Sequence, residues 1–328
     1  MHTSPLDQPG LGDSGGLNVY VRELAASMAT QGIDCDVYVR RTSREVPEVV
    51  ELGPGVNVIQ IEAGPYGLEK SDLPAVLDAW TRGVATCVAE RPVEALHAHY
   101  WLSGVVAHQL KHEFDRPLAV TFHTLGRIKK IAGELESENR IRSEELVIGC
   151  ADAVFASGSV EADQLTSLYG IARDRIEILT PGVDQTLFKP GEQNSARKSL
   201  GLVEAPTLLF VGRIQEFKGL DVAIEALSLS ANNDVRLVVV GGLSGNRGTE
   251  TYLDIKRRIE RCGLEERILF VDPQPHQLLP TYYQAADACL VPSRSESFGL
   301  VALEAAACGL PVIASNVGGL RDNVVDGV

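Results

Sequence analysis

The sequence lacks the features that mark several broad classes of protein. No stretch approaches the roughly 18 apolar residues of a membrane-spanning helix, so no transmembrane segment is predicted. Residues 1–5 contain neither a basic n-region nor an apolar h-region, so we expect no signal peptide and a cytoplasmic location. No low-complexity segment or short internal repeat is present. The composition, 45% hydrophobic and 23% charged over 328 residues, is that of a globular protein of about two domains.

Basic residues are also scarce. The chain has 30 Lys and Arg against 44 Asp and Glu, a net charge of −14, whereas a general nucleic-acid-binding protein is normally basic. We therefore expect no nucleic-acid partner. An anionic ligand would have to be held by positive charge gathered locally in an acidic background.

The six cysteines form no Cys-x-x-Cys pair, and most lie in apolar stretches such as residues 287–291. This usage predicts reduced thiols in the core rather than disulfides.

Short apolar runs alternate with helical patterns along most of the chain. Several runs are continuous in Val, Leu and Ile, as in strands of a parallel sheet that is buried on both faces. The βαβα order predicts an open, doubly wound α/β sheet. The expected strands are residues 35–39, 56–61, 95–98, 118–122, 153–156, 176–179, 207–211, 235–240, 268–271, 288–291 and 311–314.

Turn residues cluster at 180–193, and the strand–helix rhythm restarts after them. We therefore predict two Rossmann-like domains, residues 1–185 and 186–328. The first motif has no strand ahead of it, and the sequence stops where another strand is expected. On this pattern the first strand of one domain and the last elements of the other are expected to be missing.

The first motif, DSGGLN at residues 13–18, is a glycine pair that opens an amphipathic helix. Glycine lets the backbone approach a ligand closely, and free amides at a helix start attract anions. The alternative is a plain tight turn before a helix.

The second motif, FVGRIQEFKG at residues 210–219, follows a predicted buried strand. Gly212 is expected at the carboxyl end of that strand, where open α/β sheets bind ligands. Arg213 and Lys218 flank the loop, and two cations there suit a diphosphate. The alternative is a pair of solvated surface cations.

The third motif, SRSESFGLVALEA at residues 293–305, is the strongest. Glu296 ends a strand–loop passage, residues 297–299 are expected to start a helix, and Glu304 is expected at the end of its second turn. A helix start can receive phosphate, and two carboxylates can accept hydrogen bonds from sugar and ribose hydroxyls. The alternative is a capping pattern with one surface glutamate.

Together the three motifs resemble the signature of glycosyltransferase family 4, over essentially the whole chain. That family comprises retaining enzymes of the GT-B fold, with two Rossmann-like domains and the active site in the cleft between them. Residues 2–6, 12–16 and 99–104 look most similar to family members that glycosylate inositol phosphate, and less similar to sucrose-phosphate synthases.

The resemblance implies that the donor is a UDP-sugar carrying glucose or N-acetylglucosamine. It implies catalytic roles for His123, Arg213, Lys218 and Glu296. The implied donor-binding residues are Gly16, Arg213, Lys218, Glu296, Ser297, Phe298, Gly299 and Glu304.

The resemblance also implies a phosphorylated polyol or sugar acceptor, such as inositol phosphate. The implied acceptor-binding residues are Asn18, Lys70, Tyr100, Thr124 and Arg140. Retention without an evident protein nucleophile implies front-face attack, in which the leaving diphosphate takes the proton of the acceptor hydroxyl. Charge stabilisation and positioning would then carry catalysis without a metal or cofactor.

Several alternatives stay open from the sequence. Asp34-Cys35-Asp36 matches a metal–diphosphate motif, but it opens a strand at the sheet end away from the ligands. His97, His99 and His123 could hold a metal, although no acidic or cysteine ligand is evident nearby.

The basic stretch 126–130 leans toward sucrose-phosphate synthases. A non-catalytic fragment that retains donor binding, or serves only as a partner, is a further alternative, and a homodimer is left open. A dinucleotide oxidoreductase is disfavoured, because no Gly-x-Gly-x-x-Gly follows a strand.

Overall fold

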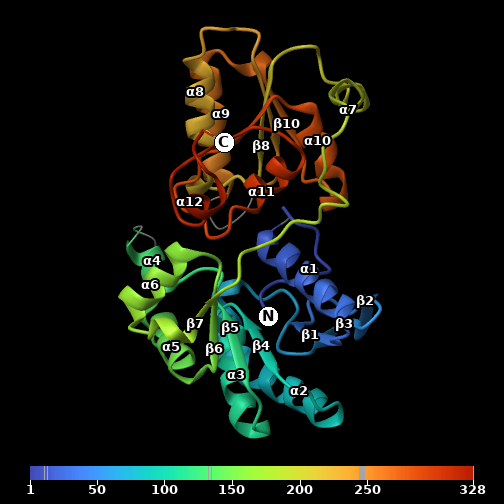
Figure 1. Ribbon diagram of the computed structural model, residues 1–328, viewed down its shortest axis with the longest axis vertical. Coiled ribbons are helices and arrows are strands. Elements are labelled where there is room, and N and C mark those ends of the chain that lie inside the picture. Colours follow the sequence, from blue (N-terminus) through green and yellow to red (C-terminus); the bar gives the residue numbers. More distant parts are fainter. Residues whose placement is uncertain (11, 13, 132, 134, 244–247, 328) are drawn as a thin grey trace. The chain divides into compact units, whose positions relative to one another are not determined.

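A computed structural model describes residues 1–328 except 11, 13, 132, 134, 244–247 and 328 (Figure 1). Two compact α/β units result, unit 1 from Met1–Asp7 and Leu17–Thr180, and unit 2 from Gln8–Gly16 and Pro181–Val328. The sequence-based division gave all of residues 1–185 to the first domain, whereas the structure gives Gln8–Gly16 to unit 2. Asp13 of the first motif lies outside the described residues. Among those described, no helix is long and apolar enough to span a membrane.

Unit 1 contains two sheets. The first has the order β1-β3-β2, in which β1 (Cys35–Arg40) runs parallel to β3 (Val56–Ile61), and β2 (Val49–Gly53) runs antiparallel to it. The second is parallel, with the order β4 (Leu96–His99), β5 (Leu118–Thr121), β6 (Ala153–Ala156) and β7 (Ile176–Ile178). The sequence did not predict β2, in which no residue is buried, so that burial does not require an apolar run there.

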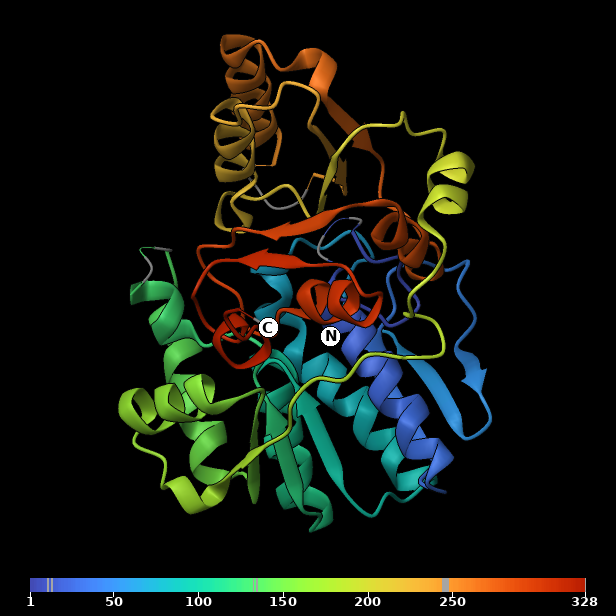
Figure 2. The same cartoon turned by 45° about the horizontal axis from the view of Figure 1, so that its top comes forward.

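The α-helices of unit 1 are α1 (Gly16–Thr30), α2 (Leu77–Glu90), α3 (Trp101–Phe114), α4 (Gly126–Ile131), α5 (Glu138–Cys150) and α6 (Ser159–Tyr169), with 3-10 turns at Lys70–Val76 and Arg173–Arg175. Helices α4, α5 and α6 gather beside β6 and β7 in both views (Figures 1 and 2). Val120 of β5 and Val154 of β6 are completely buried in this part of the core. The strand ends of this sheet are therefore held on a rigid base.

Unit 2 is built on one parallel five-stranded sheet. Its strands are β8 (Thr207–Val211), β9 (Arg236–Val240), β10 (Ile268–Val271), β11 (Ala288–Val291) and β12 (Val312–Ala314), in the order β10-β9-β8-β11-β12. Its α-helices are α7 (Gln193–Leu200), α8 (Leu220–Ser228), α9 (Gly248–Cys262), α10 (Leu279–Ala285), α11 (Leu300–Ala307) and α12 (Leu320–Asn323), with 3-10 turns at Glu216–Lys218, Glu265–Arg267 and His276–Leu278.

Strand β9, which lies between β10 and β8, shows why an inner strand of this sheet is almost continuously apolar. Leu237 and Val239 belong to the core cluster under α8 and α9, whereas Val238 and Val240 belong to the cluster under α10 and α11. Figure 1 shows α8 and α9 on one side of this sheet and α10 on the other. Alternate residues thus point to opposite faces, and both faces are covered.

The cysteine prediction is confirmed in part. All six cysteines are free, but only Cys289 and Cys308 are buried. Cys262 is exposed on α9, and Cys35, Cys87 and Cys150 are partly exposed. The apolar neighbours of a residue in sequence therefore did not decide whether its own side chain faced the core.

Candidate active site

The strand order of unit 2 brings the second and third motifs together. Strands β8 and β11 are neighbours in the sheet, although the chain builds β9 and β10 on the other side of β8 before it reaches β11. This reversal of strand order is a topological switch point, where open α/β sheets leave a crevice at the strand ends. The loops after β8 and β11 both leave the sheet there, although their motifs lie about 80 residues apart in sequence.

Lys218 and Glu296 form the contact between these loops. The Lys218 ammonium donates to a Glu296 carboxylate oxygen at 2.6 Å, and Ser293 donates to the same oxygen at 3.3 Å. The two side chains are 21% and 14% exposed. Burial acts to raise the pKa of Glu296, but the Lys218 charge and hydrogen bonds lower it overall. The carboxylate is therefore ionised and available to accept hydrogen bonds from hydroxyls.

Glycines that the sequence analysis did not single out support this loop. A Cβ on Gly318 would lie 1.9 Å from the carbonyl oxygen of Glu296, and one on Gly319 would lie 2.3 Å from that of Ser297. Gly319 N–H donates to the Glu296 carbonyl at 2.9 Å. The loop can follow this path only because no side chains stand behind it. A glycine pair after the last strand was the available sequence signal.

Helix α11 begins at Leu300, and Gly299 precedes it with φ of 71°, so the prediction that residues 297–299 open the helix is wrong. A Cβ on Gly299 would lie 2.7 Å from Leu320, which gives glycine a packing reason at this position. Phe298 is buried, and Asn323 donates to its carbonyl. The three residues therefore form the turn that leads into the helix.

The first glycine pair lies against the same region of unit 2. A Cβ on Gly15 would be 3.3 Å from Nε of Arg213, and one on Gly16 would be 3.3 Å from Leu300. Gly16, Arg213 and the start of α11 are thus close together. Arg213 is partly exposed.

Glu304 is held by internal partners. His276 Nε2 lies 2.8 Å from one carboxylate oxygen, and the Tyr283 hydroxyl donates to the other at 2.7 Å. Burial, and then the Glu304 charge, raise the pKa of Tyr283 well above its usual range, so the phenol stays a donor. A carboxylate has about four acceptor positions, so some remain for other hydrogen-bond donors. No motif in the sequence had pointed to His276 or Tyr283 in this role.

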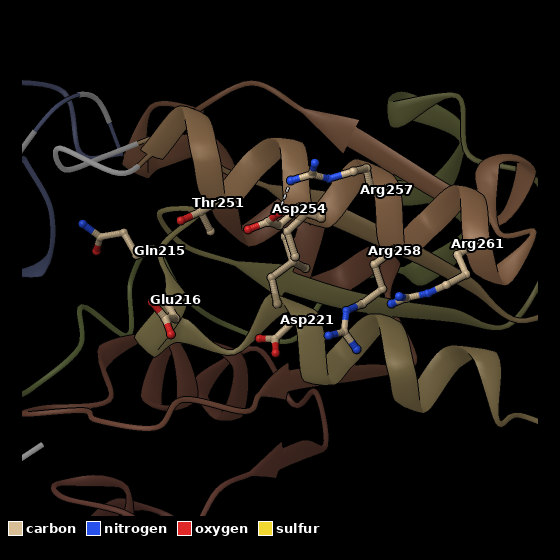
Figure 3. Close-up of a pocket in the computed structure, with 10 residues that line it drawn as sticks. Gln215, Glu216, Asp221, Thr251, Asp254, Arg257, Arg258 and Arg261 are labelled. Carbon is tan, nitrogen blue, oxygen red and sulfur yellow. Dashed lines mark hydrogen bonds and ion pairs between the residues drawn. The ribbon is translucent and has the colours of Figure 1, made fainter. Parts of the chain in front are cut away.

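A pocket of about 410 Å³ lies along α8 and α9 of unit 2 and borders Gln215 and Glu216 of the second motif (Figure 3). Three arginines contribute to it, but Arg257 pairs with Asp254, and Arg258 pairs with Glu225 at 2.9 Å. Its lining includes no residue predicted for the site. The residues are Gln215, Glu216, Leu220, Asp221, Thr251, Asp254, Ile255, Arg257, Arg258 and Arg261.

In unit 1, two adjacent strand ends carry unusual backbone geometry. Tyr100 follows β4 with φ of 75°, and His123 follows β5 with φ of 63°. Left-handed geometry is costly for bulky residues and concentrates at functional positions. Tyr100 N–H donates to the Thr121 carbonyl at 2.9 Å, which fixes the two strand ends against each other.

The same strand ends bury a group of histidines. His99 Nδ1 and His123 Nε2 share a hydrogen bond of 2.9 Å, and His97 Nε2 lies 2.9 Å from the Thr121 hydroxyl. Burial lowers the pKa of His97 to about 4 and, with a smaller contribution from His97, that of His123 to about 3. His123 is therefore neutral near pH 7. The His99–His123 hydrogen bond uses two of the nitrogens that a metal at these residues would need.

Four of the residues predicted to bind the acceptor lie together in unit 1. They are the cations Lys70 and Arg140, the phenol of Tyr100 and the hydroxyl of Thr124. The Lys70 ammonium lies 5.3 Å from the Tyr100 ring centre, and the Arg140 guanidinium lies 5.2 Å from it. Arg140 also donates to the Thr124 carbonyl at 2.8 Å and to its hydroxyl at 3.0 Å. Segments far apart in sequence thus meet at one edge of the sheet, as predicted from the doubly wound topology.

Arg140 is tied to carboxylates in a way that the sequence did not show. Its side chain is 2% exposed, it bonds Glu144 at 2.8 Å through Nε, and it also pairs with Glu136. Glu144 is completely buried and further accepts from Gly126 N–H and the Tyr169 hydroxyl. Burial raises the pKa of Glu144, against the opposing effect of Arg140. Arg140 is therefore an anchor of the fold as well as a candidate ligand contact.

Asn18, the fifth predicted acceptor residue, lies in α1 and is 2% exposed. Its side-chain amide donates to the Ser4 carbonyl, which joins the first residues of the chain to α1 within unit 1.

Basic residues of the stretch 126–130 form ion pairs within unit 1. Arg127 pairs with Glu145 and lies 5.1 Å from the Tyr169 ring centre, and Lys130 pairs with Glu138. Its excess charge is therefore matched by acids of α5. In the Asp34-x-Asp36 motif, Asp36 accepts from Asn57 at 2.9 Å and pairs with Arg91 at 3.3 Å, as a structural residue would.

Residues 15–182 match the family described as glycosyl transferase 4-like domain, and residues 191–328 match glycosyl transferases group 1. A D-inositol 3-phosphate glycosyltransferase of Xylanimonas cellulosilytica is 44% identical, over 100% of this chain and 82% of that protein. One from Actinosynnema mirum is also 44% identical, with the same coverage.

Among solved structures, sucrose-phosphate synthase from Thermosynechococcus elongatus has a TM-score of 0.92 and 32% identity, over 99% of this chain and 82% of that one. An Anabaena protein, HepE, has a TM-score of 0.77 at 21% identity, over 98% of this chain and 82% of that one, and shows the fold alone. The predicted α/β class of GT-B type is confirmed.

Proposed function

This chain belongs to the glycosyltransferases, and on that premise we propose that it transfers a sugar from a UDP-sugar to a phosphorylated polyol or sugar. The sugar is glucose or N-acetylglucosamine, and inositol phosphate is the leading acceptor. Transfer proceeds with retention of configuration and without a metal ion. Relatives 44% identical that are named for inositol phosphate support the acceptor.

The acceptor proposal rests on one observation. Lys70 and Arg140 both lie beside the Tyr100 ring, and Thr124 lies next to Arg140. A phosphate monoester carries a charge of about −1.5 to −2 and accepts hydrogen bonds on three oxygens. Two cations, a phenol and a hydroxyl match those requirements. In a chain of net charge −14, two cations beside one tyrosine ring favour an anionic ligand.

The donor half of the proposal uses residues of unit 2. Arg213 and Lys218 would neutralise the departing diphosphate, which two cations at a strand end suit. Glu296, ionised and paired with Lys218 at 2.6 Å, would accept hydrogen bonds from the sugar hydroxyls. The amide of Gly16 would contact the diphosphate, and Glu304 the ribose.

In the proposed step, the bond from the anomeric carbon to the diphosphate oxygen breaks, and a bond to the acceptor oxygen forms on the same face. The acceptor hydroxyl gives its proton to the leaving diphosphate. His123 is neutral near pH 7, so it would position the donor by hydrogen bonding rather than supply a proton as an imidazolium.

A product assay tests the proposal. Purified protein is incubated with UDP-glucose or UDP-N-acetylglucosamine and with inositol phosphate, fructose 6-phosphate or their unphosphorylated forms, with and without EDTA. We expect product with inositol phosphate, almost none with free inositol, and no loss with EDTA. We call Lys70, Tyr100, Thr124 and Arg140 the phosphate cluster. Equal use of free and phosphorylated acceptors would refute the proposal that this cluster binds the acceptor phosphate. Loss of activity in EDTA, restored by magnesium or manganese, would refute metal independence.

A sucrose-phosphate synthase-like activity is the second candidate, favoured by the TM-score of 0.92 to that enzyme at 32% identity. Its signature would be product with fructose 6-phosphate and not with inositol phosphate. The basic stretch 126–130 supports it weakly, because Arg127 and Lys130 are already paired with Glu145 and Glu138. UDP binding without any product would instead support a non-catalytic donor-binding protein.

A further inference from the structure

A cluster of metal-ligating side chains lies in unit 1 on the outer helices α3 and α5. The ligand atoms of His108, His112 and Cys150 lie within 4.8 Å of one another. His112 Nε2 is 3.2 Å from the Cys150 sulfur, and the two imidazole ring centres are 4.9 Å apart. None of these residues belongs to the proposed transfer site.

Sequence spacing and helix packing explain the convergence. His108 and His112 are four residues apart, so they lie on one face of α3. Gly104 lies one turn earlier, and a Cβ there would be 3.0 Å from Val147, so α5 approaches α3 closely. Cys150 ends α5 three residues after Val147, on the same side of that helix.

The end of α5 is also fixed in place. Lys111 donates to the Cys150 carbonyl at 3.0 Å and to Asp152 at 2.6 Å. These two contacts of Lys111 hold the backbone at Cys150 in place, so the sulfur stays next to the histidines.

We propose that His108, His112 and Cys150 bind one divalent transition-metal ion of the zinc class. Two imidazoles and a thiolate suit zinc, and its fourth position would be open to water. In a tetrahedral zinc site, nitrogen and sulfur ligands lie about 3.5 Å apart, close to the 3.2 Å between His112 and Cys150. Binding replaces the thiol proton, which is released to solvent.

A second observation concerns a buried nitrogen of the same cluster. The Nδ1 atom of His108 is buried and, among the described residues, has no hydrogen-bond partner. Buried polar atoms are normally paired, and an exception requires an explanation. A metal held through this nitrogen would supply its partner. Burial, with smaller effects of His112 and Lys111, lowers the pKa of His108, which favours the neutral ring that a metal needs.

The ion would join the carboxyl ends of α3 and α5. Tyr100 immediately precedes α3, and Arg140 lies in the first turn of α5. Ten residues of helix separate Arg140 from Cys150, or about 15 Å. The ion would therefore stiffen the helix pair that carries the phosphate cluster without touching a substrate.

Cobalt and zinc binding to the whole chain test the proposal. Protein freed of metal by a chelator is titrated with Co²⁺, and the absorption band of a thiolate–cobalt bond is followed before Zn²⁺ is added in competition. We expect one ion per chain, a thiolate band, and a higher midpoint of thermal unfolding with zinc. C150S should lose the band, and its zinc affinity should fall by more than the 10- to 100-fold that loss of an outer partner typically costs.

Two further variants make the result unambiguous. H112Q changes an exposed side chain and should fold, yet it should weaken zinc binding as C150S does. C262S changes the exposed cysteine of α9 and should bind zinc like the wild type. Absence of the thiolate band in wild type, or equal zinc affinity in H112Q and C262S, would overturn the proposal. Neither result would bear on sugar transfer, which the product assay tests separately.

Discussion

Lys218 in unit 2 and Arg140 in unit 1 are cations of the two candidate sites, and their surroundings differ. In unit 2, Lys218 meets one carboxylate, and both partners keep some exposure, 21% and 14%. In unit 1, Arg140 is 2% exposed and pairs with two carboxylates, one of which, Glu144, is completely buried. A partly exposed pair can open toward a ligand at little cost, whereas a buried pair is part of the core. A cation predicted to contact a ligand can thus have either of two physical roles.

The difference predicts that Arg140 is needed first for folding. R140A leaves the Glu144 carboxylate buried without its cation, which typically costs about 3–5 kcal/mol of unfolding free energy. Both tryptophans, Trp80 and Trp101, lie in unit 1, so their fluorescence during urea unfolding reports this unit. R142A, a change at an exposed neighbour on α5, should shift the free energy by about 0.5 kcal/mol or less.

A double variant separates lost charge balance from lost packing. R140A/E144Q removes the unpaired charge and should recover part of the stability that R140A loses. Equal stability of R140A and wild type would show that the buried pair is not an anchor. The acceptor KM should also rise in any folded R140A protein, because Arg140 adjoins Thr124 at 3.0 Å.

Lys218 should matter for binding rather than for folding of unit 1. K218A removes a charge-assisted contact to the diphosphate, worth about 1.5–3 kcal/mol, or about 10- to 150-fold in UDP affinity. Calorimetric titration with UDP measures the loss, and K198A, at an exposed lysine of α7, is the matched control. The tryptophan unfolding curve should not move. Unchanged UDP affinity in K218A would remove Lys218 from the donor site.

Lys70 tests the acceptor more cleanly than Arg140, because its side chain is exposed. K70A should raise the KM for the phosphorylated acceptor about tenfold, or about 1.4 kcal/mol, and leave the KM for the UDP-sugar unchanged. K70R should retain most of the affinity. K130A is the control, and a larger effect in K130A than in K70A would shift acceptor binding to the basic stretch 126–130.

The buried histidines of unit 1 and Glu296 of unit 2 should also respond to different ranges of pH. An unfolded chain protonates histidine near pH 6.5, whereas the folded chain holds the pKa of His97 at about 4 and that of His123 at about 3. Stability of unit 1 should therefore be full above pH 6.5 and fall by about 1.4 kcal/mol per pH unit per histidine as the pH is lowered. The pKa of Glu296 is lowered from 4.5, so its contribution is lost only below that value.

Tryptophan-detected urea unfolding at pH 7, 6 and 5 measures this slope. H97Q should reduce it by about one proton, or about 1.4 kcal/mol per pH unit. A slope that H97Q leaves unchanged would mean that His97 does not titrate as a buried neutral ring.

Much of the fold could be read from the sequence because burial constrains it directly. A strand covered on both faces must be continuously apolar, and the expected strand at residues 235–240 was found as β9. Strand β2 escaped prediction because none of its residues is buried, so it has no such constraint. The start of α11 was misplaced because Gly299 opens it from a left-handed turn, which letters alone do not show.

The sequence by itself identified the candidates for the chemistry, which are glycines, cations and glutamates in motifs beside predicted strands and helices. Those choices are local, because residue type and position relative to a strand fix what a side chain can donate or accept. The tertiary structure alone decided their partners. It placed Lys218 against Glu296, Arg140 between Glu136 and Glu144, and His112 beside Cys150. These pairings depend on strand order and helix packing, which bring together groups that the chain itself keeps apart.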